Sequence, residues 1–215
     1  MLVVEDILLL ATATGRRSLG YLDLFVAGGL LTDLALAGNV RITEPGESVR
    51  KNRIVAVSDA PWPTDELLAD AMGIVKAKPE WRGYTLLEKL AKKLPDRIYA
   101  RLAQAELVSG EERKLLGLFP TTTWTVLDTR RVEELQATLD EVLLFGKPAD
   151  LQAATLIALL HAGRLLQHVV YRDRKVDRKA LKTQGKALMK QHWTAVAMDS
   201  AMQNRDAAAA AAAAS

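Results

Sequence analysis

Three histidines are the side chains in this sequence that could bind a transition metal: His161, His168 and His192. His161 and His168 are seven residues apart and would share one face of a helix, but a zinc site needs three or four ligands. No His-Glu-x-x-His motif accompanies them, and the chain contains no cysteine. We therefore expect no metal site, and we interpret His161 as a packed histidine with a local hydrogen-bond partner.

Motifs for nucleophilic or nucleotide chemistry are also missing from the sequence. It contains no Gly-x-Ser-x-Gly, no Walker loop and no Gly-x-Gly-x-x-Gly motif. The acidic pairs Glu111-Glu112 and Glu133-Glu134 occupy adjacent positions, which point apart on a helix and do not converge on a substrate. The sequence therefore predicts a protein that binds a partner, and neither an enzyme nor a cofactor site.

Basic residues form two dense segments. The first runs over residues 172–182, and in a continuous helix its cations at 174, 175, 178 and 182 would share a stripe with Tyr171. The second contains Lys89, Lys92, Lys93, Arg97 and Arg101. Either these segments are solvated helix faces, or they bind an anion such as lipid phosphate or a nucleic-acid backbone.

Length and composition place these segments in one globular domain. The chain has 215 residues, 49% of them hydrophobic, and a formal net charge of +3. Glu5-Asp6 stands where a signal peptide requires positive charge, and the apolar runs 7–13 and 24–31 are shorter than the roughly 18 residues that span a bilayer. We expect a cytoplasmic protein, located either in solution or at the cytoplasmic face of a membrane.

The hydrophobic pattern predicts a mainly α fold, a single compact helical domain with small peripheral β-hairpins. The expected helices cover residues 7–14, 21–37, 66–76, 86–93, 95–105, 132–144, 151–171, 172–189 and 192–202. Residues 40–42 and 53–57 are expected to pair as a hairpin, residues 121–127 to form half of a second one, and residues 111–116 to be helical or a turn. The alanine run 207–214 either extends the last helix or frays.

Particular residues within these elements carry further expectations. Thr64 or Asp65 is expected to cap the helix at 66–76, and Gly28-Gly29 indicates close packing against another helix. The segment Leu156–Leu166, which includes Leu159 and Leu160, is expected to be the most buried helix. Among the tryptophans, Trp62 and Trp81 are predicted to be the exposed pair.

Three segments, in order along the chain, resemble the Golgi phosphoprotein 3 family. They are the helix-to-strand junction at 28–40, with Leu31-Thr32-Asp33-Leu34-Ala35-Leu36-Ala37-Gly38, the Ser58-Asp59-Ala60-Pro61 turn, and the late apolar helix with the pair His161-Ala162. Glu5 with the residues 7–10 is similar to the opening helix of the family. The resemblance implies a Golgi phosphoprotein 3-like domain over residues 1–206, followed by an alanine-rich C-terminal tail over 207–215. A chain that starts directly at the domain looks like the bacterial branch.

The resemblance also implies a lipid site. Eukaryotic members bind phosphatidylinositol 4-phosphate through a Trp and an Arg near the second helix and two Arg on a mid-chain helix. In the register of Leu34-Ala35-Leu36 and of Arg101-Leu102-Ala103, these four positions fall at Ser18, Ala27, Asp96 and Tyr99. None carries the family residue, so we expect neighbouring residues to supply the positive charge that binds the headgroup. The lipid-binding residues predicted here are Arg16, Arg17, Tyr21, Arg97 and Arg101.

These expectations define two alternative functions. The first is a peripheral membrane module, an adaptor that binds an anionic, phosphoinositide-type headgroup and client membrane proteins. The second is a protein–protein scaffold that self-associates into a homo-oligomer through the β-hairpin at 121–127, without binding lipid. Nucleic acid is disfavoured as a partner because the sequence contains no nucleic-acid-binding motif.

Overall fold

A computed structural model describes residues 1–15, 21–115, 119–171 and 174–213 of the chain. Arg16 and Arg17 lie outside these residues. The described part is mainly helical, with nine α-helices, one π-helical turn and two hairpins. The elements are α1 (Val3–Ala13), α2 (Leu22–Leu36), β1 (Val40–Ile42), β2 (Ile54–Ala56), α3 (Glu66–Lys76), α4 (Gly83–Leu90), α5 (Leu94–Gln104), β3 (Val108–Leu115), β4 (Phe119–Val126), α6 (Arg130–Leu143), α7 (Leu151–Ala162), η1 (Leu166–Val170), α8 (Arg178–Gln191) and α9 (Trp193–Ala213).

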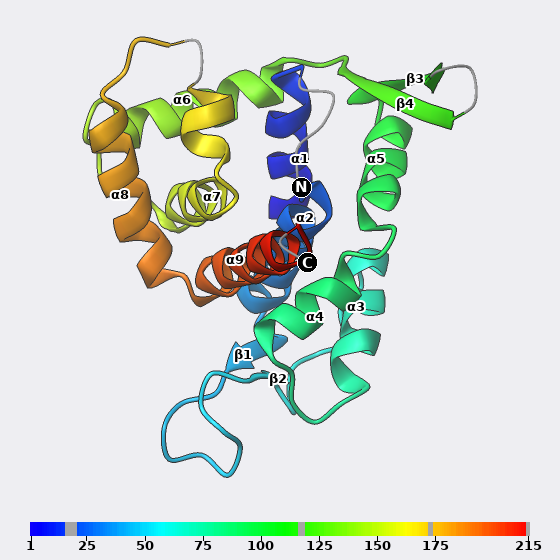
Figure 1. Ribbon diagram of the computed structural model, residues 1–215, viewed down its shortest axis with the longest axis vertical. Coiled ribbons are helices and arrows are strands. Elements are labelled where there is room, and N and C mark those ends of the chain that lie inside the picture. The colour runs from blue at the N-terminus through cyan, green and yellow to red at the C-terminus, as the bar shows by residue number, and fades with distance from the viewer. Residues whose placement is uncertain (16–20, 116–118, 172–173, 214–215) are drawn as a thin grey trace.

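Helices α1 and α2 lie at the centre of the molecule, with the other helices arranged around them (Figure 1). Asp33, near the end of α2, accepts hydrogen bonds from the first backbone N–H groups of α1, at Val3 (2.8 Å) and Val4 (3.0 Å). These N–H groups have no partner within their own helix, so Asp33 serves as the cap that α1 lacks locally. Asp33 thereby joins the end of α2 to the start of α1.

Glycines allow the helix backbones around α2 to approach closely. A Cβ on Gly29 would lie 2.5 Å from Cδ1 of Ile7 and 3.0 Å from Cα of Val4, both in α1. A Cβ on the neighbouring Gly28 would collide with the Met198 side chain of α9. The close packing that the sequence predicted for this glycine pair is therefore confirmed, with α1 on one side and α9 on the other.

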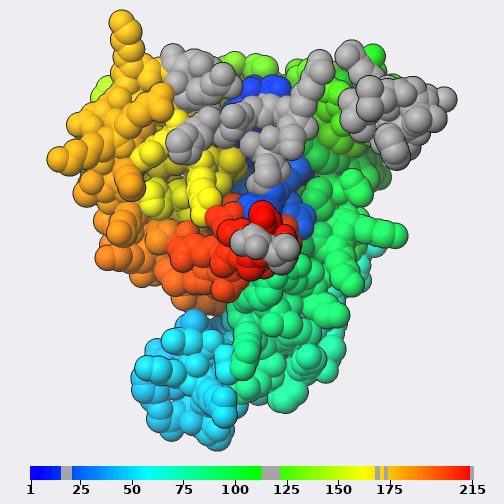
Figure 2. All heavy atoms as spheres, viewed as in Figure 1, coloured from blue at the N-terminus to red at the C-terminus, as the bar shows by residue number. Residues whose placement is uncertain are grey.

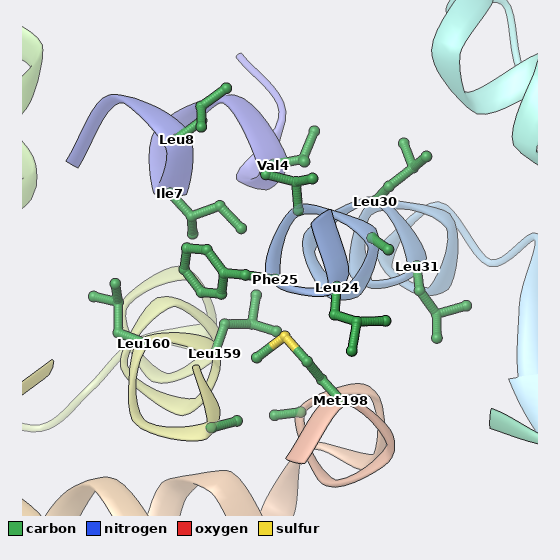
Figure 3. Packing of buried hydrophobic residues seen from close by; sticks show 14 of the residues in the cluster. Val4, Ile7, Leu8, Leu24, Phe25, Leu30, Leu31, Leu159, Leu160 and Met198 are labelled. Carbon is green, nitrogen blue, oxygen red and sulfur yellow. The ribbon is translucent and has the colours of Figure 1, made fainter. Parts of the chain in front are cut away.

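The core continues from α2 into α7 and α9. Phe25 of α2 points between α1 and α7, and Met198 of α9 closes the same space from below (Figure 3). Leu159 and Leu160 are completely buried, as predicted. A helix this apolar is stable in water only when it is surrounded on most sides, which its position between α1, α2, α8 and α9 provides.

Both expected hairpins are present as two-stranded antiparallel sheets. β1 pairs with β2 through Val40–Ala56 and Ile42–Ile54, and the segment between them projects from the body of the molecule (Figures 1 and 2). β4 confirms the strand predicted at 121–127. Its partner β3 includes residues 111–115, so the prediction of a helix or turn at 111–116 was wrong. Pairing with β4, from Val108–Val126 to Leu115–Phe119, makes this polar segment a strand.

The C-terminal third departs from the sequence prediction at two points. The helix expected at 151–171 ends at Ala162. Gly163 then packs against Phe25, and Arg164 adopts a left-handed conformation (φ 59°). The chain continues into the π-helical turn η1. The basic helix expected at 172–189 starts only at Arg178, where the Asp177 side chain accepts hydrogen bonds from the backbone N–H groups of residues 179 and 180. The alanine run extends the last helix, α9, to Ala213, which is one of the two outcomes expected for it.

Tryptophan exposure was predicted correctly at one position and wrongly at the other. Trp62 is half exposed, at 51%, and lies beside the ammonium group of Lys76. Trp81, by contrast, is only 4% exposed. Its backbone pairs with Ile54 of β2, and its indole N–H donates to the carbonyl of Val75 (2.8 Å), so the ring is held beneath α3.

Candidate functional site

A cavity of about 310 Å³ lies where α3, α4 and α5 meet above α2. Its floor is apolar and comes from four elements: Leu30, Leu67, Ala71, Ile74, Leu90 and Leu94. Its rim is charged, with Lys89, Lys92 and Arg97 against the single carboxylate of Asp70. The cavity therefore combines an apolar base with a cationic opening, an arrangement suited to an anionic group attached to an apolar body.

Local sequence features position the three helices that form the rim. Asp65 caps α3, as predicted, by accepting hydrogen bonds from the N–H groups of Leu67 (2.9 Å) and Leu68 (3.2 Å). Lys93 has a left-handed backbone (φ 56°) and Pro95 stands in the first turn of α5, so the chain turns sharply between α4 and α5. This turn places Lys92 between Lys89 on α4 and Arg97 on α5.

The rim cations differ in how they are compensated. Arg97 donates to Asp70 across the rim at 2.6 Å, with both side chains exposed to solvent. Lys89 and Lys92 are exposed, and within the described ranges neither forms an ion pair or a side-chain hydrogen bond. Two ammonium groups are thus available to an external anion, while Arg97 would have to exchange Asp70 for it.

Arg101, one turn further along α5, has a mainly structural role. Its guanidinium donates to Glu5 of α1 (2.8 Å) and to Asp65 at the start of α3 (2.7 Å). The pKa of Asp65 is lowered: burial acts in the opposite direction, but the hydrogen bond from Arg101 and the N–H groups of α3 outweigh it. The arginine joins three helix ends, and both of its carboxylate partners are already in place.

Tyr21 lies away from α5. It precedes α2 in a left-handed conformation (φ 65°), and the Arg205 guanidinium of α9 lies 5.3 Å from the centre of its ring. A hydrogen bond to Asp206, also of α9, raises the pKa of the Tyr21 hydroxyl. The structure therefore brings Arg97 and Arg101 together on one helix but places Tyr21 against another, and the predicted Arg16 and Arg17 are outside the described residues.

The chain matches the Golgi phosphoprotein 3 (GPP34) family over residues 3–205. It belongs to the Golgi phosphoprotein 3 family. The helical fold with two small hairpins agrees with the resemblance that the sequence segments indicated. No protein of curated function matches the chain.

Two of the positions that correspond to lipid ligands in the Golgi phosphoprotein 3 resemblance, Ala27 and Tyr99, serve packing in this chain, and a third, Ser18, lies outside the described residues. Ala27 is completely buried in α2. Tyr99 stacks on Trp124 of β4, with the ring centroids 4.5 Å apart and the planes 2° from parallel, and its hydroxyl lies 3.1 Å from Oγ1 of Thr12. Asp96 is exposed and negatively charged. These positions offer no cation to a headgroup, in contrast to the rim of the cavity one turn away.

Within this member of the Golgi phosphoprotein 3 family, the other basic segment does not form the stripe that a continuous helix would have made. Tyr171 is completely buried, and its hydroxyl donates to Asp140 of α6 at 2.6 Å. Arg174 donates to the same carboxylate at 2.7 Å. Burial is the main cause of a raised Tyr171 pKa, and the bonded carboxylate adds to it. Tyr171 and Arg174 therefore tie this segment to α6, and Arg172 is outside the described residues.

Two further properties of the described residues bear on function. No helix among them is long and apolar enough to cross a membrane. No group of three or more His, Asp or Glu side chains in the same part of the chain is arranged to hold a metal ion. Sequence reasoning missed the apolar floor, which combines side chains of α2, α3, α4 and α5, and it missed Asp70 of α3. Neither gives a local signal beside Lys89 and Lys92.

Proposed function

We propose that the chain is a peripheral membrane module that binds the headgroup of an anionic phospholipid in the cavity between α3, α4 and α5. Lys89 and Lys92 attract the headgroup phosphate, and Arg97 joins them by exchanging Asp70 for the lipid. The observation that carries this proposal is a pair of ammonium groups over an apolar floor, with no ion-pair partner for either in the described part of the chain.

Family membership supports the same reading at a coarser level. The resemblance described above implies a phosphoinositide-type headgroup and an adaptor role with client membrane proteins, and this chain belongs to that family over residues 3–205. The residues differ from the family pattern, however: Ala27 is buried, and Tyr99 is partly buried and stacked on Trp124. We therefore assign the headgroup to the rim of the cavity, and we propose binding and not catalysis as the activity.

Cosedimentation with vesicles tests this proposal. Neutral phosphatidylcholine vesicles are compared with vesicles that also contain phosphatidylserine or phosphatidylinositol 4-phosphate at matched surface charge. The Lys89→Ala/Lys92→Ala variant should bind anionic vesicles about 30-fold more weakly, since a lysine near such a surface contributes roughly 1 kcal/mol. The control is Lys179→Ala/Lys190→Ala, which removes the same charge from exposed positions on α8.

The comparison separates a headgroup site from general attraction to a charged surface. A cavity that recognises the headgroup predicts tighter binding to one of the two anionic lipids and little effect of the α8 control. If the wild type ignores both anionic vesicles at low salt, or if the two double variants lose affinity equally, the assignment is wrong.

A scaffold role is the second candidate, and the β3–β4 hairpin favours it. Both strands are eight residues long, and in the described part of the chain each pairs with the other alone, so neither outer edge has a partner strand. Sedimentation velocity over a range of concentrations would detect a dimer, and Thr125→Lys on β4 should weaken it. A monomer at every concentration would remove this candidate.

A further inference from the structure

A second cavity, of about 290 Å³, lies on the opposite part of the fold between α7, α8 and α9. Unlike the first, it is lined mainly by polar and charged side chains: His161, Arg164, Leu166, Gln167, Lys182 and Asp199. The lipid site proposed above uses none of these residues. The cavity is small enough to enclose a compact polar ligand and too polar for an acyl chain.

The imidazole of His161 occupies this cavity because of a glycine on the facing helix. A Cβ on Gly185 of α8 would lie 2.6 Å from Nδ1 of His161. Glycine inside a helix costs roughly 1 kcal/mol relative to alanine, so a glycine at 185 weakens α8 in exchange for this space. The histidine predicted to be packed with a local partner is instead half-buried at a cavity wall. Its ring has no hydrogen-bond partner among the described residues.

The backbone that presents the other side chains is irregular. Arg164 has a left-handed conformation (φ 59°), which is unfavourable for a residue with a side chain, and the π-helical turn η1 follows two residues later. π-Helical turns are rare and occur frequently at functional sites. This irregular segment contributes Arg164, Leu166 and Gln167 to the lining of the cavity that His161 also lines.

Charge at the cavity is predominantly positive. Lys182 is exposed and forms no ion pair within the described ranges, and Lys186 is close enough to act on His161. Arg164 bonds to Asp206 at 2.7 Å in an exposed, exchangeable pair. The one carboxylate in the lining, Asp199, accepts a hydrogen bond from Gln203 at 2.7 Å. An anion entering the cavity would therefore meet more positive than negative charge.

We propose that this second cavity binds a phosphate monoester. Arg164 and Lys182 balance its charge, the amide of Gln167 donates to one oxygen, and His161 donates to another. Gln167 keeps one N–H on the carbonyl of Arg178 and has a second to offer. A bound phosphate would also release Arg164 from Asp206, and Asp199 would then face a protonated His161.

Proton uptake by His161 accompanies binding. In the free protein burial lowers the pKa of His161; the Asp199 carboxylate opposes this shift, and the ammonium groups of Lys182 and Lys186 add to it. The ring is therefore neutral near pH 7 and gains a proton when a dianion arrives. Affinity for the phosphate monoester should rise as the pH falls from 8 to 6, since a positive imidazole donates through both nitrogens.

Histidine NMR on the full chain tests the proposal, with inorganic phosphate and glycerol 3-phosphate as probes at pH 6 and pH 8. The His161 signal, assigned with His161→Ala, should shift saturably and titrate at higher pH in the presence of either probe. Lys182→Ala should weaken binding by roughly tenfold or more, as expected for a lost charge-assisted hydrogen bond. Lys190→Ala, also on α8, should have no effect.

Gly185→Ala provides a second variant, because the added methyl group should displace the imidazole and abolish the phosphate-induced shift while helical circular dichroism is retained. No saturable shift in the wild type, or equal affinities of Lys182→Ala and Lys190→Ala, would overturn the proposal.

Vesicles containing phosphatidic acid, a lipid phosphate monoester, distinguish the two sources of the ligand. Binding that depends on Lys182 and is displaced by glycerol 3-phosphate indicates a lipid headgroup, and a response to the soluble probes alone indicates a free metabolite. Lys89→Ala/Lys92→Ala should leave the His161 shift unchanged, so this test is independent of the function proposed above.

Discussion

Replacing Gly29 with alanine tests how closely α1 and α2 pack. Within an isolated helix the substitution should stabilise by roughly 1 kcal/mol, because glycine is the more flexible residue in the unfolded chain. In the structure, however, the new Cβ would lie 2.5 Å from Cδ1 of Ile7 and 3.0 Å from Cα of Val4. The Ile7 side chain can rotate away, but the Val4 atom belongs to the backbone and moves only with the whole of α1.

Gly73→Ala is the matched control. Gly73 is an exposed residue within α3, and a Cβ there would meet no atom within 4 Å. This variant should gain the stability that helix propensity predicts, about 0.5–1 kcal/mol. Overpacking a core typically costs about 1–3 kcal/mol, so the two variants should differ by about that amount, with Gly29→Ala less stable than the wild type or equal to it.

Urea unfolding followed by circular dichroism at 222 nm measures this difference directly. The slope with denaturant should stay constant across the three proteins, which would assign the change to stability and not to a different native state. If Gly29→Ala is as stable as Gly73→Ala, then α1 and α2 do not approach as closely as the structure has them. The capping of α1 by Asp33 of α2 would then need revision as well.

Three other predictions follow from buried or partly buried polar groups. Burial raises the pKa of Asp33 to about 7, against the hydrogen bonds from Val3 and Val4, so the folded state holds the proton more tightly than the unfolded state. The unfolding free energy of the wild type should therefore fall relative to that of Asp33→Asn as the pH rises from about 4 to 7. Above pH 7 the difference between the two proteins should stay constant. A difference that does not change anywhere between pH 4 and pH 7 would contradict the raised pKa. Arg205 joins α9 to Asp23 of α2 (2.8 Å) and to Glu88 of α4 (2.6 Å). In urea unfolding, Arg205→Ala should lower the unfolding free energy by about 1–2 kcal/mol. The control Arg41→Ala removes an exposed pair with Glu47 and should change the unfolding free energy little. Metal analysis of the purified protein should find no stoichiometric zinc, and one equivalent that disappears in His161→Ala would refute this expectation.

Features that depend on neighbouring residues in the chain could be predicted from the sequence. The helix at Glu66–Lys76 begins and ends where the pattern placed it, because Asp65 caps its own next residues and the signal is local. The first hairpin follows from two short β-branched segments around a turn. Gly28-Gly29 indicated close packing because a glycine pair is unfavourable in a helix unless something requires the space.

Features that depend on distant partners could not be predicted. Residues 111–115 are polar and became a strand only through pairing with β4. Trp81 is flanked by Glu80 and Arg82, yet β2 and the carbonyl of Val75 hold it in the core. The apolar pattern continues past Ala162, and the contact between Gly163 and Phe25 of α2, which no local pattern records, accompanies the end of α7 there.

The candidate site likewise combines features that depend on nearby residues with features that depend on distant ones. The sequence by itself determined the density of cations at 89–101 and the helical class of the fold, because charge and apolar periodicity are properties of a short stretch of chain. Only the tertiary structure decided which cations remain available. Arg101 is engaged by Glu5 and Asp65, and Arg97 by Asp70. Lys89 and Lys92, by contrast, have no ion-pair partner among the described residues and lie above a floor built by four elements. The reason is that an ion pair or a cavity is made by side chains from separate elements, whose meeting depends on how the helices pack.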